Sequence, residues 1–194
     1  MKKPVPIKDQ VLVRLHASSL NHRDVWIRSE QTAVPDNGVI LGSDGSGVVE
    51  AVSEEGDPSL VGKEVVINPS HEWGNDPAFQ ADSFKILGYP DNGTFGQWIL
   101  VSKKYIHDKP GHLTMEEAAA VPLSGLTAYR ALFTKARLRP GEKVLITGVG
   151  GGTALWALQL ALGFMAKVYV TSSSKEKIDK AIALGAVGGF NYKE

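Results

Sequence analysis

Short runs of apolar residues, several of them alternating with polar ones, fill the first half of the chain. Residues 11–16, 47–52 and 63–68 are rich in Val, Leu and Ile, and each run is bounded by Gly, Pro, Asp or Asn. This pattern predicts short β-strands joined by turns. We expect an antiparallel, barrel-like β region that also includes a strand at 97–102, with the aperiodic stretch 68–96 forming a surface lobe.

Helical and strand patterns alternate in the second half. Thr114 and Glu117 fit a capping box, which predicts a helix over residues 115–121 that is interrupted at Pro122. Helical spacing then resumes, and helices and apolar strands follow each other, with strands expected at 144–146, 168–171 and from about 190, and helices at 126–135, 154–162 and 175–184. This order is typical of a parallel sheet.

A glycine-rich loop separates the strand at 144–147 from the helix that follows it. Its residues are Gly148, Gly150, Gly151, Gly152 and Thr153. Glycines at this place permit a tight turn and let backbone N–H groups approach a pyrophosphate at a helix N-terminus. We interpret the loop as a dinucleotide-binding site in preference to a plain strand-to-helix turn, although a threonine stands at the third glycine position of the GxGxxG pattern.

The strand at 168–171 is not followed by a carboxylate, which NAD-binding proteins usually place there to accept hydrogen bonds from the ribose hydroxyls. Ser172, Ser173 and Ser174 occupy this position, with lysines shortly after them. Hydroxyls and lysines suit a 2′-phosphate, which a carboxylate would repel, so the sequence favours NADPH over NADH. The alternative is that the serines only cap the next helix.

Composition and charge exclude several classes of protein. Twenty-one basic and twenty-one acidic residues give no net charge, so nucleic acid is not an expected partner. The absence of cysteine excludes disulfides, thiol nucleophiles and thiolate-bound metals. No apolar run approaches the roughly 20 residues that span a bilayer, and the N-terminus has no signal-peptide core. We expect a soluble, cytoplasmic protein with no membrane partner.

Motifs along the chain occur in an order that resembles the medium-chain dehydrogenase/reductase family, on its zinc-free quinone oxidoreductase side. They include Ser-Leu-Asn-His-Arg-Asp at 19–24, Leu-Gly-Ser-Asp-Gly-Ser-Gly at 41–47, Gly-Thr-Phe-Gly-Gln-Trp at 93–98 and Gly-Leu-Thr-Ala-Tyr at 125–129. The resemblance implies an α/β protein with a β-rich domain. A GroES-like β barrel over residues 1–121 would be followed by the first half of a Rossmann domain, a doubly wound parallel sheet, over residues 122–194.

The resemblance also implies that no zinc is bound. In the zinc alcohol dehydrogenases of this family a cysteine, a histidine and a second cysteine hold the catalytic metal, and these positions fall on Asn21, Ser43 and Leu123. None of the three is a normal zinc ligand. The structural zinc of those enzymes needs four cysteines in the lobe, where this chain has none, and we interpret His71 and Glu72 in the lobe as solvated surface groups.

Without a Lewis acid, the favoured substrate is a quinone or an α,β-unsaturated carbonyl, which accepts hydride at carbon and leaves charge on oxygen. Zinc-free relatives place an Asn-x-x-Asp-x-Tyr segment around this small-molecule acceptor. Asn21 and Asp24 match the segment as candidate catalytic residues, whereas Trp26 stands at the tyrosine position. The alternative is that Asn21 and Asp24 only fix the turn after the strand.

The resemblance further assigns roles in cofactor binding. Thr127 matches a threonine near the nicotinamide, although it could equally be an internal helix residue. Lys177 and Tyr192 match positions that hold the 2′-phosphate in NADPH-dependent relatives.

Full-length relatives add strands before residue 10 and further chain after residue 194, and the resemblance implies that they form homo-oligomers. The leading hypothesis is a zinc-independent, NADPH-dependent oxidoreductase. The alternatives are a truncated, non-catalytic nucleotide-binding or interaction protein, and an alcohol dehydrogenase. We expect the 194-residue chain alone to bind NADPH weakly and to show no turnover, because hydride transfer needs cofactor and acceptor in contact.

Overall fold

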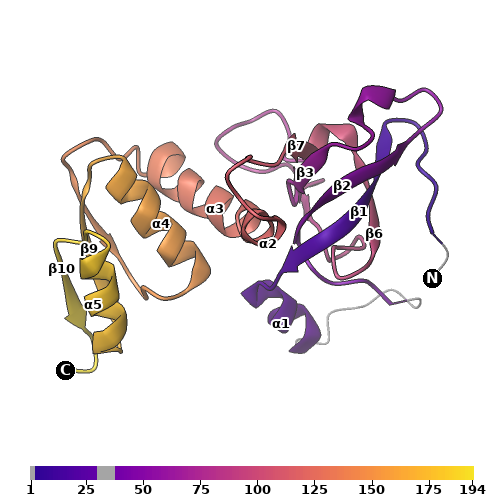
Figure 1. Cartoon of the computed structure of the whole chain (residues 1–194). Helices are drawn as coiled ribbons and strands as arrows, with labels where there is room; N and C mark the ends of the chain where they lie inside the picture. Colours follow the sequence, from indigo (N-terminus) through magenta and orange to yellow (C-terminus); the bar gives the residue numbers. More distant parts are fainter. Residues whose placement is uncertain (1–2, 30–37) are drawn as a thin grey trace. The chain divides into compact units, whose positions relative to one another are not determined.

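The computed structural model describes residues 3–29 and 38–194 (Figure 1). Backbone contacts divide the chain into two compact units, Met1–Leu123 and Ser124–Glu194. The domain boundary expected from the sequence, between residues 121 and 122, lies two residues before this division. Each unit has its own fold and its own apolar core, and the two are described separately.

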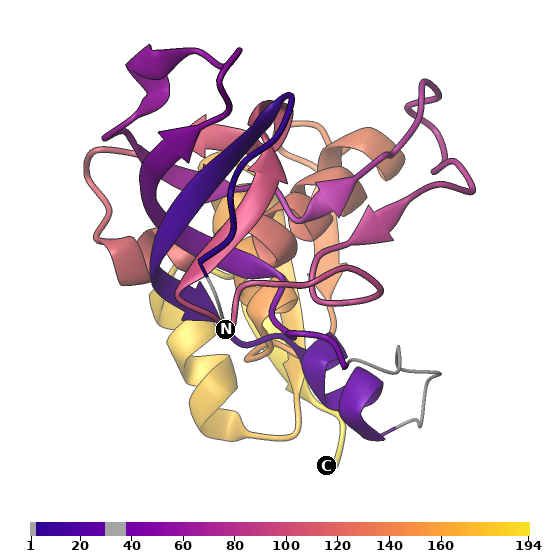
Figure 2. The same cartoon turned by 90° about the vertical axis from the view of Figure 1, so that its right-hand side faces the viewer.

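The first unit is built on a five-stranded antiparallel sheet with the strand order β6-β1-β2-β3-β7. Figure 2 shows the indigo strand β1 beside the pink strand β6. The strands are β1 (Gln10–Ser19), β2 (Asp44–Val52), β3 (Glu64–Ile67), β6 (Trp98–Ser102) and β7 (Ile106–Asp108). Alternate positions face inward, and a core of β-branched and leucine side chains forms between them, including Val13, Val49, Val65, Ile67 and Ile99.

Short elements complete this unit. The 3-10 turns η1 (Pro58–Leu60) and η2 (Lys103–Tyr105) connect strands. The lobe contains a small two-stranded sheet, β4 (Ser70–His71) and β5 (Lys85–Ile86). Helix α2 (Met115–Ala119) begins with the predicted capping box, because the Thr114 side chain accepts from the Glu117 N–H and the Glu117 carboxylate accepts from the Thr114 N–H.

The structure adds one helix to this unit and corrects one expectation. The segment after β1 is helix α1 (His22–Ser29), which was not predicted, because its mostly polar residues give it little of the apolar periodicity that predicts helices. The His71 side chain is half-buried rather than solvated, and its ring stacks on Tyr105 with centroids 3.8 Å apart. Glu72 is exposed, as expected, and accepts a hydrogen bond from the Tyr105 hydroxyl at 2.9 Å.

Proline at position 122 starts a helix instead of interrupting one. Helix α2 ends at Ala119, and α3 runs over Pro122–Tyr129. Proline fits the first turn of a helix because the N–H that it lacks has no intrahelical partner there. The helix then widens into a π-helical turn, η3 (Arg130–Lys135), in which the Ala136 N–H donates to the Ala131 carbonyl.

The second unit contains the predicted parallel sheet, with the order β10-β9-β8. Its strands are β8 (Lys143–Ile146), β9 (Lys167–Ser172) and β10 (Gly188–Asn191), and α4 (Gly152–Gly163) and α5 (Lys175–Ala183) connect them. Both strand pairs are parallel. Apolar side chains from the sheet and helices form the core, including Leu158, Ala161, Val168, Val170 and Ile178. This strand-helix alternation confirms the partial Rossmann-like half of the predicted fold.

Candidate active site

Asn21 links two buried carboxylates in the first unit. It precedes α1, and its backbone N–H donates to Asp24 Oδ2 at 2.8 Å. Its side-chain amide Nδ2 donates to Asp44 Oδ2 at 2.9 Å. Asp24 lies in the first turn of α1, and Asp44 is the first residue of β2. The structure thus brings the predicted pair Asn21 and Asp24 together and adds Asp44 as a third polar residue.

Asp44 is held by three segments that are distant in sequence. Besides the Asn21 amide, the backbone N–H of Leu123 donates to its Oδ1 at 2.8 Å, and the Thr94 hydroxyl donates to its backbone carbonyl at 2.7 Å. Burial raises the pKa of the Asp44 carboxyl to about 6, and the charge of Asp24 acts in the same direction. The hydrogen bonds from Asn21 and Leu123 lower this pKa and only partly offset burial.

Arg23 ties α1 to the end of the lobe. Its guanidinium donates to the Ser43 hydroxyl oxygen at 3.0 Å and to the Leu87 carbonyl at 2.8 Å. The Ser43 hydroxyl in turn donates to the same Leu87 carbonyl at 2.7 Å. Burial lowers the pKa of Arg23, whereas the nearby charge of Asp24 raises it. Ser43, the residue at the second zinc-ligand position, is therefore engaged in hydrogen bonds of its own.

Only one carboxylate oxygen of Asp24 accepts a hydrogen bond at the start of α1. Its backbone N–H donates to the Asn21 carbonyl at 3.0 Å, and its Oδ2 accepts the Asn21 N–H. These bonds fit the alternative in which the two residues fix local structure. The second oxygen, Oδ1, is buried and has no hydrogen-bond partner within the described part of the chain. Local structure alone therefore does not account for the whole side chain.

Sequence reasoning did not single out Asp44 or Arg23 as site residues. An aspartate inside a strand and between small residues, as in Gly-Ser-Asp-Gly at 42–45, was the available signal, because charged groups are rarely buried without partners. Across residues 3–29 and 38–194, no three His, Asp or Glu side chains lie close enough to hold a metal ion. No helix of these residues has the length and apolar character needed to cross a membrane.

The glycine loop of the second unit leaves helix α4 open at its N-terminus. Gly148 and Gly150 have positive φ angles of 65° and 123°, a conformation that favours glycine. The Gly148 N–H donates to the Thr171 hydroxyl at 3.2 Å, which fixes the loop to the end of β9. In the described structure no side chain caps α4 at Gly151. Its first-turn N–H groups, including that of Thr153, therefore suit a phosphate.

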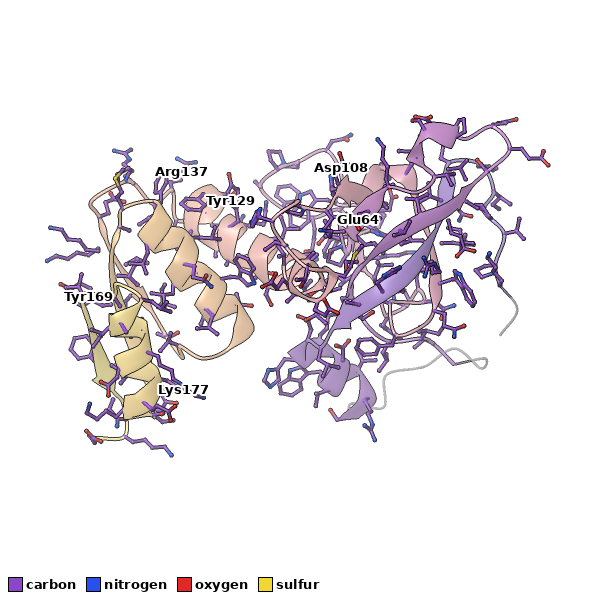
Figure 3. The ribbon with its side chains drawn as sticks, viewed as in Figure 1. Glu64, Asp108, Tyr129, Arg137, Tyr169 and Lys177 are labelled. Carbon is purple, nitrogen blue, oxygen red and sulfur yellow. The ribbon has the colours of Figure 1, made fainter. Side chains whose placement is uncertain are left out.

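Lys177 extends along the glycine loop. A Cβ atom built on Gly150 would lie 2.7 Å from Lys177 Cδ and 3.3 Å from its Nζ, so the absence of a side chain at Gly150 makes room for the lysine. Lys177 belongs to α5, where Figure 3 labels it. Gly152 in turn faces the Ser124 hydroxyl, which would lie 3.1 Å from a Cβ there. An ammonium group and open helix N–H groups thus meet at one loop, as binding of a phosphate requires.

The three serines at the end of β9 have different surroundings. Ser172 is buried, and its hydroxyl oxygen accepts from the Ser174 N–H at 3.2 Å. Ser174 caps α5, since its hydroxyl oxygen accepts from the Lys177 N–H at 3.4 Å, which fits the capping alternative. Ser173 is exposed. Tyr192 is also exposed and lies at the same end of the sheet, where its N–H donates to the Ser172 carbonyl at 3.2 Å.

Thr127 lies on α3 with an exposed side chain. The predicted cofactor residues are therefore divided between two places. The glycine loop, Lys177 and the end of β9 are contiguous, whereas Thr127 belongs to α3. The assignment of Thr127 to the nicotinamide stays a prediction.

Comparison with known proteins identifies the chain. Residues 7–111 match the family model described as the alcohol dehydrogenase GroES-like domain, which covers more than half of the chain. The chain belongs to the medium-chain dehydrogenase/reductase superfamily. This finding confirms the resemblance drawn from the motifs. A curated member, a zinc-type alcohol dehydrogenase-like protein of Leptosphaeria maculans, is 37% identical over 100% of this chain and 57% of its own length.

Other members of the superfamily carry different names. The quinone oxidoreductase of Homo sapiens is 29% identical over 98% of this chain and 52% of its own length. A crystal structure of an NAD-dependent alcohol dehydrogenase aligns with a TM-score of 0.93 and 37% identity, covering 100% of this chain and 59% of that one. A crotonyl-CoA carboxylase/reductase in complex with NADP aligns with a TM-score of 0.85 and 30% identity, covering 100% and 52%. This chain thus spans about half the length of these relatives.

Proposed function

We propose that this chain supplies the acceptor-binding domain and the adenosine-binding half of a zinc-independent, NADPH-dependent oxidoreductase. Its acceptor is a quinone or an α,β-unsaturated carbonyl. The observation that carries this proposal is the glycine loop of the second unit, where Lys177 extends along Gly150 beside the uncapped N-terminus of α4. A dinucleotide phosphate has both an opposite charge and backbone donors at this loop.

The proposed site for the hydride acceptor is formed by residues of the first unit. Asn21, Ser43 and Leu123 stand where zinc-binding members have their ligands, so the negative charge that develops on the acceptor oxygen has to be stabilised by hydrogen-bond donors. The Asn21 amide uses one N–H for Asp44 and keeps a second for an acceptor. A quinone or an enone suits such a site because hydride adds at carbon and no alcohol proton has to be removed.

The choice of NADPH rests on this chain's own residues, because the printed names of the structural relatives include both an NAD-dependent enzyme and an NADP complex. Residues 172–174 are serines, and no carboxylate stands among them to repel a 2′-phosphate. The exposed Ser173 and Tyr192, with Lys177 on α5, are the groups proposed to receive this phosphate.

Cofactor titration and turnover test the proposal separately. Calorimetric titration of the 194-residue chain should show NADPH binding more tightly than NADH. Extending the chain with the C-terminal part of a quinone oxidoreductase should then give oxidation of NADPH by a quinone or enone panel, followed by absorbance. If neither cofactor binds, or if the extended protein oxidises NADPH with no member of the panel, the proposal is wrong.

Two alternative functions have observations of their own. Trp26 stands where relatives have a tyrosine, and its exposed indole has no phenolic proton to give, which favours a nucleotide-binding protein without turnover. Tight NADPH binding without turnover in the extended protein would support it.

An alcohol dehydrogenase is suggested by the names of relatives. Stoichiometric zinc in the purified protein would support that alternative.

A further inference from the structure

Two acidic side chains of the first unit meet at one neutral residue. Asp24 and Asp44 are 6% and 1% exposed. Asn21 donates its backbone N–H to Asp24 and its side-chain amide to Asp44, so that a single residue bridges the two carboxyl groups. Burying one carboxylate is costly unless it is paired with a cation or well hydrogen-bonded, and burying two that bond to the same residue is costlier still.

The hydrogen bonds around these carboxyls leave one acceptor unused. Both oxygens of Asp44 accept bonds, from Asn21 and from Leu123. Asp24 Oδ2 also accepts a bond, but its Oδ1 is enclosed and lacks a donor within the described part of the chain. An enclosed carboxylate oxygen without a donor is destabilising. A proton bound by one of the two carboxylates removes one negative charge from this enclosed site.

We propose that Asp24 and Asp44 form a carboxyl pair that binds one proton and that positions Asn21. In the described chain the ionisable groups that act on this pair are its own two carboxyls and Arg23, whose guanidinium is engaged with the Ser43 hydroxyl and the Leu87 carbonyl. The other groups packed against Asp44 are neutral, namely the Thr94 hydroxyl and the Leu123 amide.

The charge of Arg23 interacts with Asp24, so the buried Asp44 carboxylate has no cation of its own, and a bound proton removes its negative charge. The rise in the pKa of Asp44 to about 6, caused first by burial and reinforced by Asp24, agrees with this pairing. The proton is placed here on Asp44, and the neighbouring charge of Asp24 helps to hold it there.

The bound proton has a consequence that rests on the proposed function. Charge develops on the acceptor oxygen as hydride arrives, and an anion beside Asn21 opposes that charge. The protonated pair therefore favours hydride transfer, and the ionised pair disfavours it. Asp24 and Asp44 act in this scheme through Asn21, as positioning residues, and no covalent step involves them.

Carboxyl titration by ¹³C NMR tests the pair on the 194-residue chain, without cofactor or acceptor. In the wild-type protein we expect one aspartate carboxyl to titrate about 2 pH units above an exposed aspartate. Asp24→Asn should lower the midpoint of Asp44, because it removes the neighbouring charge. Asp44→Asn should abolish the high midpoint. Asp108→Asn, which changes an exposed carboxyl labelled in Figure 3, should leave it unchanged.

Two results would overturn the proposal. One is that every aspartate titrates below about pH 5 in the wild-type protein. The other is that Asp24→Asn leaves the midpoint of Asp44 in place, since Asp44 would then be an isolated buried acid. If the variants do not fold, the wild-type titration still decides, because the first of these results needs neither a variant nor a substrate.

Discussion

Ser172 is the residue on which the cofactor preference can be tested most directly. Its hydroxyl accepts the Ser174 N–H, and an aspartate at this position can accept the same bond. Because Ser172 is buried, Ser172→Asp should also cost some stability, so its folding is checked first; it places a negative charge at the end of β9. We expect NADPH affinity to fall at least about tenfold more than NADH affinity, because like charges in contact are strongly unfavourable. Calorimetric titration with both cofactors measures the difference.

Ser172→Asn is the matched control for this substitution, since asparagine has the size of aspartate and a similar acceptor oxygen but no charge. It should change the two affinities by similar factors. Equal losses of NADPH and NADH affinity in Ser172→Asp would mean that the 2′-phosphate does not lie near this strand end.

The pH dependence of stability follows from the buried Asp44. Its pKa is raised in the folded protein, so the folded protein binds the proton more tightly than the unfolded chain does. The free energy of unfolding is then greatest below about pH 4 as far as this group is concerned, and it falls through the window between about pH 4 and 6 by up to about 3 kcal/mol. Urea unfolding measures the free energy of unfolding of wild type and Asp44→Asn at several pH values. The pH dependence of the difference between the two proteins is the contribution of Asp44.

Single residues also show where sequence reasoning stops. Asn21 and Asp24 could be predicted to lie together because they are three positions apart, and the structure shows them hydrogen-bonded. Asp44 could not be placed in the same way, since its partners come from residues 21, 94 and 123. Contacts between distant segments depend on the whole fold, so a pattern within one segment does not contain them.

Among the elements, the loop before β2 and the C-terminal part of the lobe approach each other closely at glycines. A Cβ atom at Gly93 would overlap the carbonyl oxygen of Gly42, and one at Gly88 would lie 2.9 Å from the same oxygen. Gly93→Ala should destabilise the first unit by about 3 kcal/mol or more, because backbone atoms have to move. Gly111→Ala, at a glycine with open space around it, is the control and should change stability by less than about 1 kcal/mol. Urea denaturation compares the two variants, and similar losses would contradict the packing described.

The elements that could be predicted are those with strong local signals. The capping box at Thr114 and Glu117 predicted the start of α2, and the strand-helix alternation after residue 143 predicted the parallel sheet. Helix α1 was missed because its polar residues carry little periodicity, and it is fixed instead by Asp24 at its first turn and Arg23 against the Leu87 carbonyl. Strands β4 and β5 are two residues each, too short for any alternation to be recognised.

At the scale of the whole molecule, the two units have separate apolar cores. Ile67 belongs to the core of the first unit and Leu158 to that of the second, and both side chains are fully buried. Leu158→Ala should destabilise the second unit by about 2–5 kcal/mol, the range for removing a buried leucine side chain. Hydrogen exchange should show faster opening in β8, β9 and β10 and little change in β1 to β3. Ile67→Ala should give the opposite distribution, and equal acceleration everywhere in either variant would mean that the units unfold as one.

The sheet of the second unit ends on both sides in an outer strand, β8 and β10. Each carries a largely exposed apolar side chain, Leu145 and Phe190. Outer strands present N–H and C=O groups that a strand of another molecule can pair with. We therefore expect molecules of this chain to attract one another edge to edge, so that association increases with protein concentration. Static light scattering of a dilution series should give a negative second virial coefficient, and Leu145→Lys should raise it.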